Sequence, residues 1–534
     1  MSYVELHCHS VFSLLDGAAQ PEQLVARAAT LGMPAIALTD HDDLGGAVRF
    51  ATTAATAGIG GIIGVELTVA VPMARVPSGA AARATDDTLL DTHLVLLAES
   101  REGYGNLSTL VTRARLDQWR GQPRVSLETL AAHSAGLFAL TGCSRGWVPT
   151  LVARGASDAA CAATATLLDI FDRRVALECW DHALPEERRT VRELHAIARA
   201  LDVPWVVTND VHYADPTGRL AHDVLCALKH GATLDEMGTR LRPNGEWYLK
   251  GYTQLARRWQ GLEQGLTQSL AIAERCTFRL ADVKPTLPRF PLPDGIGDDA
   301  YLAQLVEQGA QERWGWRRTA RHDAQIAHEL ALIAKLGLAG YFLIVWDIVR
   351  FARREGVLCQ GRGSAANSAV CYVLGITAVD PIKLELLFER FLSEERKEPP
   401  DIDIDFAHRD REKVLQYVYE RYGREHAAMV CEHITWRGRS AVRDSARVLG
   451  FSPQQAEAIA MFSDRFSAKA TAAALRVGGD ASEASADEKA DPFRPEEQDA
   501  KGPAGYRKQL DARTIAEHIG MDMMTGTQAV NRMR

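Results

Sequence analysis

Residues 1 to about 215 alternate short β-rich runs with helical stretches that are rich in alanine and arginine. This alternation restricts the fold more than any other feature of the chain, because strands that alternate with helices form a parallel α/β architecture. We therefore expect an α/β fold here, with parallel strands closed into a barrel. The strand-like runs are AIALTD, GGIIGVEL, HLVLLAE, LFALTG, VALECW and WVVTND.

Side chains that bind metals occur at the ends of these expected strands. His7 and His9 are two positions apart, so strand geometry points both imidazoles to the same side. The C-terminal ends of barrel strands meet at one face, so ligands distant in sequence can form one site. The other candidate ligands are Asp16, His41, Glu66, His93, Cys143, Asp210 and His212. This donor set favours zinc, iron or manganese. The alternative is that the histidines are buried with ordinary hydrogen-bond partners and that Cys143 is a structural residue.

The second half of the chain begins after a helical, tryptophan-containing stretch and a proline-rich linker, KPTLPRFPLPDG. Helical periodicity then runs through residues 323–356, and a short strand, a small-residue turn and a helix follow in VLCQGRGSAANSAVCYVLGI. A further helix is expected in DREKVLQYVYERYG. Residues 463–505 contain few large apolar side chains, which predicts a linker or disorder.

The segment EPPDIDIDF places three aspartates on alternate positions. A strand has a period of two, so Asp401, Asp403 and Asp405 should share one face while Ile402 and Ile404 enter a core. Adjacent carboxylates repel one another unless a cation lies between them, and a purely oxygen donor set suits magnesium. The alternative is the polar outer face of an edge strand.

The segment QGRGSAANSA follows a strand and opens a helix, where free backbone N–H groups can bind phosphate. Gly361 and Gly363 let the backbone approach closely, Ser364 can donate a hydroxyl, and Arg362 can pair with a phosphate oxygen. Together with the aspartates forty residues later, this arrangement favours nucleotidyl transfer by two metal ions.

Residues 1 to about 215 resemble a PHP (polymerase and histidinol phosphatase) domain, because all nine ligand positions of that family are filled. The resemblance implies a distorted β/α barrel that holds Zn²⁺ or Mn²⁺ and hydrolyses phosphoesters. It implies one ion near His7, His9, Glu66 and Asp210, a second near Glu66, His93 and Cys143, and a third near Asp16, His41 and His212. The alternative to phosphoester hydrolysis is that the bound metal ions only stabilise the fold.

The second half resembles the bacterial C-family DNA polymerases, the DNA polymerase III alpha subunits. The matching segments are GYFLIVWDIV, GRGSAANSAVCYVLGITAVDP, LLFERFL, PPDIDIDF and YVYERYGRE. The resemblance implies a polymerase-beta-like nucleotidyltransferase palm of α+β type. Asp401 and Asp403 would be catalytic Mg²⁺ ligands, and Gly363 and Ser364 would belong to the triphosphate loop.

Several arginines are implied to contact phosphate. Arg390 and Arg396 would contact the nucleotide, although ion pairs with neighbouring glutamates would explain them too. The segment TWRGRSAVRDSARVLG is expected to begin a partial helical thumb, where its arginines could contact the DNA backbone. The alternative is that these arginines lie on a solvated helix face. The arginines of this stretch are Arg437, Arg439, Arg443 and Arg447. The segment PPDIDIDF and the complete set of PHP ligand positions resemble the error-prone branch of this polymerase family. That branch is associated with damage-induced translesion synthesis.

The expected organisation is a PHP domain with a helical extension (1–283), a palm (284–432), the start of a thumb (433–462), a linker (463–505) and an unassigned tail (506–534). The family's third catalytic aspartate is not found, since Asp511 and Asp522 lack flanking strand patterns. We therefore expect a truncated polymerase that synthesises little or no DNA alone. The alternatives are a PHP phosphoesterase or 3'-to-5' exonuclease, and a catalytically silent DNA-binding fragment.

Composition supports a cytoplasmic protein. The 534 residues carry a net charge of -8, which argues against indiscriminate coating of nucleic acid but not against a local basic cleft. Nine cysteines without a spacing pattern fit a reducing compartment. No apolar run suggests a membrane span, and no signal peptide is seen. The expected partners are primer-template DNA and dNTPs, with a sliding clamp and mutagenesis accessory proteins in the full-length family.

Overall fold

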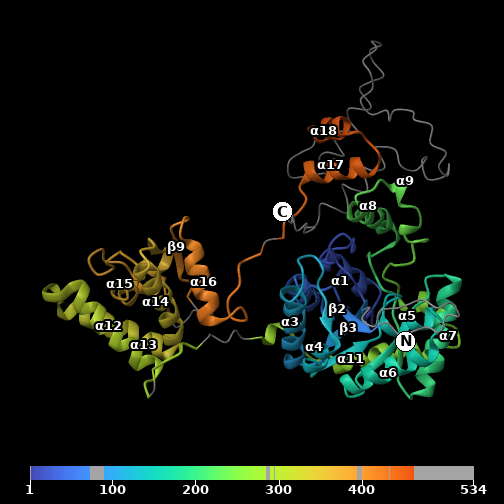
Figure 1. The fold of residues 1–534 in the computed structure, drawn as a ribbon, viewed down its shortest axis with the longest axis horizontal. Coiled ribbons are helices and arrows are strands. Elements are labelled where there is room, and N and C mark those ends of the chain that lie inside the picture. Colours follow the sequence, from blue (N-terminus) through green and yellow to red (C-terminus); the bar gives the residue numbers. More distant parts are fainter. Residues whose placement is uncertain are drawn as a thin grey trace, which may run out of the picture. The chain divides into compact units, whose positions relative to one another are not determined.

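The computed structural model describes residues 2–72, 89–283, 289–293, 295–393, 400–431 and 433–461. These residues form two units (Figure 1). The first combines the described residues up to Val283 with those from His433 onward, and the second ends at Cys431. The expected domain boundaries stay predictions, and the expected linker and tail lie outside the described residues.

The first unit is mixed α/β and is built on a curled sheet. Within the described residues the sheet has seven strands in the order β1-β2-β3-β5-β6-β7, with β4 paired to β2 outside this path. The strands are β1 (Ala35–Leu38), β2 (Gly60–Pro72), β3 (Leu89–Ala98), β4 (Val125–Ser126), β5 (Leu137–Leu140), β6 (Val175–Cys179) and β7 (Trp205–Val207).

The strands are parallel to their neighbours except for β3, which is antiparallel to both β2 and β5. The expectation of parallel strands is therefore wrong for β3. Pro72 at the end of β2 pairs with Leu89 at the start of β3. The chain thus reverses direction at this edge, and strands related in this way run antiparallel.

The N-terminal segment contacts both ends of the sheet. Glu5 bridges to Ile36 of β1, and Cys8 bridges to Val211, just beyond β7. Backbone hydrogen bonds accompany these bridges, from His9 N to the Val211 carbonyl at 2.7 Å among others. The sheet is curled because its two edge strands share this segment.

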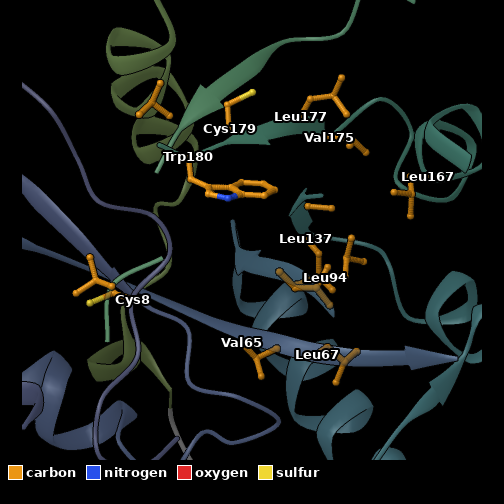
Figure 2. Close-up of a cluster of buried hydrophobic side chains, with 14 of the residues drawn as sticks. Cys8, Val65, Leu67, Leu94, Leu137, Leu167, Val175, Leu177, Cys179 and Trp180 are labelled. Carbon is orange, nitrogen blue, oxygen red and sulfur yellow. The ribbon is translucent and has the colours of Figure 1, made fainter. Parts of the chain in front are cut away.

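Apolar side chains cover both faces of the sheet. Alternate residues of a strand point to opposite faces, so Leu94 and Leu96 of β3 join one buried cluster while Val95 and Leu97 join another. Figure 2 shows the first cluster, in which Leu94 lies with side chains from β2, β5 and β6 around Trp180. Burial on both faces explains the nearly continuous apolar sequence of β2.

Helices surround this sheet and extend the first unit beyond it (Figure 1). Those described are α1 (Pro21–Thr30), α2 (Ala47–Ala57), α3 (Arg101–Leu116), α4 (Leu127–Ala132), α5 (Trp147–Ala153), α6 (Ser157–Ile170), α7 (Pro185–Ala200), α8 (Arg219–His230), α9 (Leu234–Met237), α10 (Tyr252–Arg258), α11 (Gln264–Arg275), α17 (Gly438–Val448) and α18 (Pro453–Met461).

The stretch expected to begin a thumb packs onto the first unit. Val448 of α17 lies in one buried cluster with Val224 and Ala227 of α8. Trp436, just before α17, packs against the cluster that contains Tyr213. Apolar contacts therefore hold α17 on α8.

The second unit is largely helical, with a small two-stranded sheet. Its described elements are α12 (Asp298–Trp314), α13 (Ala320–Lys335), α14 (Ala339–Arg354), β8 (Cys359–Arg362), α15 (Ala369–Val373), β9 (Asp403–Phe406) and α16 (Arg411–Tyr422). Strands β8 and β9 are antiparallel, with Arg362 opposite Asp403 and Gln360 opposite Asp405. This register brings the small-residue turn after β8 beside the aspartates of β9.

Among the described residues no single helix is long and apolar enough to cross a membrane. Helices α13 and α14 are long and apolar enough only when they are taken together, and the chain bends by 115° between them.

Candidate functional site

Glu66 is the centre of the candidate metal cluster in the first unit. It lies on β2 and is 3% exposed. Its Oε1 is 2.9 Å from His93 Nδ1, 3.1 Å from Cys143 Sγ and 3.4 Å from His7 Nε2. Its Oε2 is 3.0 Å from His41 Nδ1. One carboxylate thus joins ligand candidates from four separate segments.

The HxH pair meets Asp210 on the other side of this cluster. His7 Nε2 and His9 Nε2 are 3.1 Å apart, and Asp210 Oδ1 lies 3.5 Å from His9 Nε2 and 3.2 Å from His212 Nε2. Asp210 has a left-handed φ of 42°, a conformation that aspartate tolerates better than most residues.

Asp16 lies at the edge of the cluster, beside two histidines. Its Oδ1 is 3.1 Å from His212 Nδ1 and 3.7 Å from His222 Nε2, and its Oδ2 is 3.5 Å from Lys229 Nζ. The expected third group of Asp16, His41 and His212 stays a prediction. His222 of α8 stands beside Asp16, whereas His41 groups with Glu66 and His93.

Buried polar neighbours orient the histidine ligands. His7 Nδ1 is 2.6 Å from Glu178 Oε1, and Thr208 donates to the same oxygen. His9 Nδ1 is 2.9 Å from Ser13 Oγ. Partners at the far nitrogen fix the ring and leave Nε2 facing the cluster. Glu178 is not among the predicted site residues, although a charged residue inside the apolar run VALEC was its signal.

Electrostatics keep the acidic ligands ionised. Burial alone would raise the pKa of Glu66, but the imidazoles of His93, His41 and His7 outweigh it and hold this pKa well below the ordinary value. Burial likewise opposes ionisation of Asp210, and the neighbouring His212 lowers its pKa well below the ordinary value. Both carboxylates can therefore accept a cation at neutral pH.

The residues present fit a metal centre. Within the described residues four groups of three have ligand atoms that lie within 4.8 Å of one another. In that same part of the chain, His93 Nε2 and His212 Nδ1 are buried without a hydrogen-bond partner, and His212 Nδ1 lies 3.1 Å from Asp16 Oδ1. An ion between these two atoms would satisfy both. The imidazole, carboxylate and thiolate donors are those of zinc or manganese sites.

Arg242 supplies a cation beside this cluster. Its guanidinium contacts His212 Nε2 and lies 3.6 Å from Asp210 Oδ2. The same group stacks over Trp247, 4.5 Å from the ring centroid. A partly exposed arginine at the edge of a metal cluster is suited to hold a phosphate oxygen.

The aspartates of the second unit lie as the alternation predicts. Asp401, Asp403 and Asp405 are exposed, whereas Ile402 and Ile404 are half-buried against the core of this unit. The carboxylates therefore share the solvent face, and the isoleucines hold the strand to the core. Asp401 precedes β9, which begins at Asp403.

The turn after β8 lies next to these carboxylates. Gly363 has a φ of 68°, and a Cβ at this residue would lie 3.8 Å from Asp403 Oδ2. Ser364 is half-buried and follows directly. Arg362 Nε is 3.1 Å from Asp405 Oδ1, an exposed pair that a phosphate could displace. Arg390 is exposed, and Arg396 lies outside the described residues.

The helix after this turn does not offer the free N–H groups that we expected. Ala369 N and Val370 N donate to the Glu329 carboxylate at 2.9 and 3.0 Å, and Cys371 N donates to Ser368 Oγ. Because Glu329 already occupies the N-terminus of α15, a phosphate must contact the turn itself. The expectation is wrong because a buried carboxylate far away in sequence caps this helix.

Tyr341 holds the start of the aspartate segment. Its hydroxyl accepts a hydrogen bond from Ile402 N at 3.1 Å. Burial is the largest of the effects that raise the pKa of this phenol. Tyr341 is not among the predicted site residues, because nothing in GYFLIV marks one ring as a partner of a distant strand.

Two family models match the chain. The model of the bacterial DNA polymerase III alpha NTPase domain matches residues 300–502, and that of the PHP domain matches residues 5–182. An error-prone DNA polymerase of Mycobacterium bovis is 46% identical over 463 residues, which cover 86% of this chain and 42% of that protein. The chain belongs to the DNA polymerase III alpha family.

Other relatives of this polymerase family agree. An error-prone DNA polymerase of Anaeromyxobacter dehalogenans is 40% identical over 552 residues, covering 86% of this chain and 46% of the relative. The chain thus spans less than half of the length of these curated relatives. The structure of an amidohydrolase from Chromobacterium violaceum is 19% identical with a TM-score of 0.27, and the match covers 40% of this chain and 88% of that chain.

The arginines before and on α17 of this member of the DNA polymerase III alpha family lie mostly at the surface. Arg437, Arg439 and Arg447 are exposed, and Arg443 is half-buried. Arg443 pairs with Glu457 of α18, with nitrogen-to-oxygen distances of 2.6 and 2.9 Å. Arg439, Arg443 and Arg447 are four residues apart, which places them on one helix face. Contact with DNA stays a prediction.

Proposed function

We propose that this chain provides the nucleotide-binding palm and the PHP metal centre of an error-prone DNA polymerase, which adds dNTPs to a primer 3' end. The observation that carries the proposal is the pairing of β8 with β9. This pairing sets the exposed Asp403 opposite Arg362 and beside the Gly363 turn.

Each palm residue has a role in this proposal. Asp401 and Asp403 present oxygen ligands for Mg²⁺, which when bound neutralises charge on the reacting phosphate. The backbone of Gly363 and the hydroxyl of Ser364 face the triphosphate, and Arg362 exchanges Asp405 for a phosphate oxygen. Tyr341 fixes the backbone at Ile402 and so positions the carboxylates on either side.

The relatives support an error-prone polymerase by their names alone. Because this chain covers less than half of their length, the substrates and partners are part of the proposal. We propose primer-template DNA and dNTPs as substrates and damage-induced translesion synthesis as the process. A sliding clamp and mutagenesis accessory proteins are proposed as partners of the full-length family.

A second candidate function is metal-dependent hydrolysis of phosphoesters, as a phosphoesterase or 3'-to-5' exonuclease, at the PHP site. The observation in its favour is the buried ligand cluster around Glu66 with the unpaired nitrogens of His93 and His212. Arg242 would hold the substrate phosphate at the edge of that cluster. A third candidate, a catalytically silent DNA-binding fragment, needs neither feature.

The test of the palm measures Mg²⁺-dependent binding of a fluorescent dNTP to the full chain, with a primer extension gel beside it. We expect Asp403→Asn to weaken binding by at least about tenfold, which corresponds to loss of one charge-assisted contact. Asp405→Asn is the matched control, because it alters the same face of β9 without removing a proposed Mg²⁺ ligand; it releases Arg362 for the phosphate and so should not weaken binding. Equal binding by both variants, or no binding by the wild type, would overturn the proposal.

The test of the PHP site uses the same 5'-labelled primer-template with Mn²⁺ and no dNTPs. Shortening of the primer by the wild type, lost in His9→Ala and retained in His230→Ala, would support hydrolysis at this site. His230 is an exposed histidine at the end of α8 and serves as the control. Shortening that survives in His9→Ala would point to a contaminating nuclease and would contradict the assignment.

A further inference from the structure

His222 is a buried histidine to which no role has yet been given. It is the fourth residue of α8 and is 1% exposed. We propose that His222 is a metal ligand and completes, with Asp16 and His212, a site for a divalent zinc- or manganese-type cation. The inference rests on the proposed metal centre and assigns one of its ions to residues that sequence analysis did not combine.

The contacts of the His222 ring are long. Arg242 Nε donates to Nε2 at 3.4 Å, Asp223 Oδ1 lies 3.6 Å from Nδ1, and Cys226 Sγ lies 3.7 and 3.8 Å from the two nitrogens. Nε2 also lies 3.7 Å from Asp16 Oδ1, so an ion between these two atoms would exchange the long Arg242 contact for a metal bond.

The distances match those between ligands of one ion. Two ligand atoms about 2.1 Å from a tetrahedral zinc lie about 3.4 Å apart. Asp16 Oδ1 is 3.1 Å from His212 Nδ1 and 3.7 Å from His222 Nε2. All three ligand atoms lie within 4.8 Å of one another. The two rings meet edge to face, with centroids 5.5 Å apart.

The tautomer of His212 agrees with this assignment. Its Nδ1 is buried beside Asp16 and has no hydrogen-bond partner in the described part of the chain. Its Nε2 lies 3.2 Å from Asp210 Oδ1. A neutral imidazole has one lone pair, so an Nε2–H that donates to Asp210 leaves the Nδ1 lone pair for the ion. Arg242, which also contacts Nε2, would then move toward Asp210.

Lys229 does not block the site, and Arg242, which donates to His222 Nε2, would turn away when the ion binds. Lys229 contacts Asp16 through Oδ2, whereas both histidines face Oδ1. The Lys229 side chain is 47% exposed and can turn into solvent. Two imidazoles and one carboxylate leave a coordination position open, as in catalytic zinc sites. The site would therefore take a water molecule or a phosphate oxygen as its further ligand.

The test counts ions in the full chain after removal of metal with a chelator and reloading with Co²⁺ or Zn²⁺. We expect His222→Ala to bind one ion fewer per chain than the wild type, by elemental analysis, with a matching loss of Co²⁺ visible absorption. His230→Ala, on the same helix but exposed, should bind the wild-type number. Unchanged ion content in His222→Ala would overturn the inference.

A second variant separates a ligand from a structural residue. His222→Cys keeps a ligand atom, so we expect it to recover the lost ion and to increase thiolate-to-Co²⁺ absorption above that of the wild type. A cysteine variant that folds, by circular dichroism, but lacks the ion would contradict direct ligation. If the wild type binds no metal, the proposed metal centre itself fails; if it binds and His222→Ala matches it, only this inference fails.

Discussion

Lys250 illustrates how single buried residues support the metal cluster. Its Nζ donates to Asn209 Oδ1 at 3.0 Å, and Asn209 N donates to the Glu5 carboxylate. Asn209 immediately precedes Asp210, so this chain of contacts fixes the backbone of a ligand candidate. Burial is the main cause that lowers the pKa of Lys250 to about 8.

The lowered pKa predicts how stability changes with pH. Between pH 8 and the ordinary value of 10.5 the folded chain has released a proton that the unfolded chain retains. Stability therefore rises through this window, by on the order of 1–3 kcal/mol from this residue. Urea unfolding of the chelator-treated chain should show that Lys250→Met flattens this rise, whereas exposed Lys383→Met keeps it. Identical slopes in both variants would contradict the prediction.

At the scale of elements, α15 depends on a residue from another helix. Glu329 of α13 is fully buried and accepts hydrogen bonds from Ser368 Oγ and from the backbone of Ala369 and Val370. Gln325 donates to the same carboxylate. A five-residue helix is too short to be stable by itself. Glu329 thus fixes both α15 and the turn that precedes it.

Replacing Glu329 should loosen the second unit. Glu329→Gln keeps the shape of the side chain but replaces one carboxylate oxygen with an NH2 group. One of the hydrogen-bond donors around Glu329 would then face another donor. We expect the free energy of unfolding of this unit to fall by about 1–3 kcal/mol, measured by urea unfolding. Glu312→Gln, on the exposed face of α12, is the control and should change it by less than about 0.5 kcal/mol. A similar loss in both variants would show that the cap contributes nothing specific.

At the scale of the whole molecule, the chain returns to its first unit after the second. His433 meets Phe12 edge to face at 5.1 Å, and Trp436 donates to Asp444 Oδ2 at 2.8 Å while packing against the cluster around Tyr213. Phe12 lies three residues from the ligand candidate His9. This return therefore links the candidate metal centre to α17 and its arginines.

The return segment predicts a local change in protection. Trp436→Ala removes both the packing of the ring and its hydrogen bond, so backbone amides of α17 and α18 should exchange with deuterium at least about tenfold faster. Amides of β2 and β3 should keep their rates. Trp316→Ala is the control, because this tryptophan is 93% exposed. Unchanged exchange in α17 would mean that Val448 alone holds the helix on α8.

Much of the fold and of the candidate site follows from local patterns. The alternation in DIDID predicts which side chains face solvent, because the period of a strand is two whatever surrounds it. The continuous apolar runs predict buried strands, and the family resemblance is shown by the matches over residues 5–182 and 300–502. The antiparallel direction of β3 could not be predicted from the sequence, because it depends on which strands pair with β3.

Local sequence patterns are sufficient for the family, for the strand faces and for the residue types available as ligands. The positions of His222 beside Asp16 and of Glu329 at the N-terminus of α15 emerge only in the folded chain. Sequence spacing determines the directions of side chains within one helix or strand, but not which elements pack together. Which side chains from separate elements meet depends on how buried surfaces pack, and on the need of each buried polar atom for a partner.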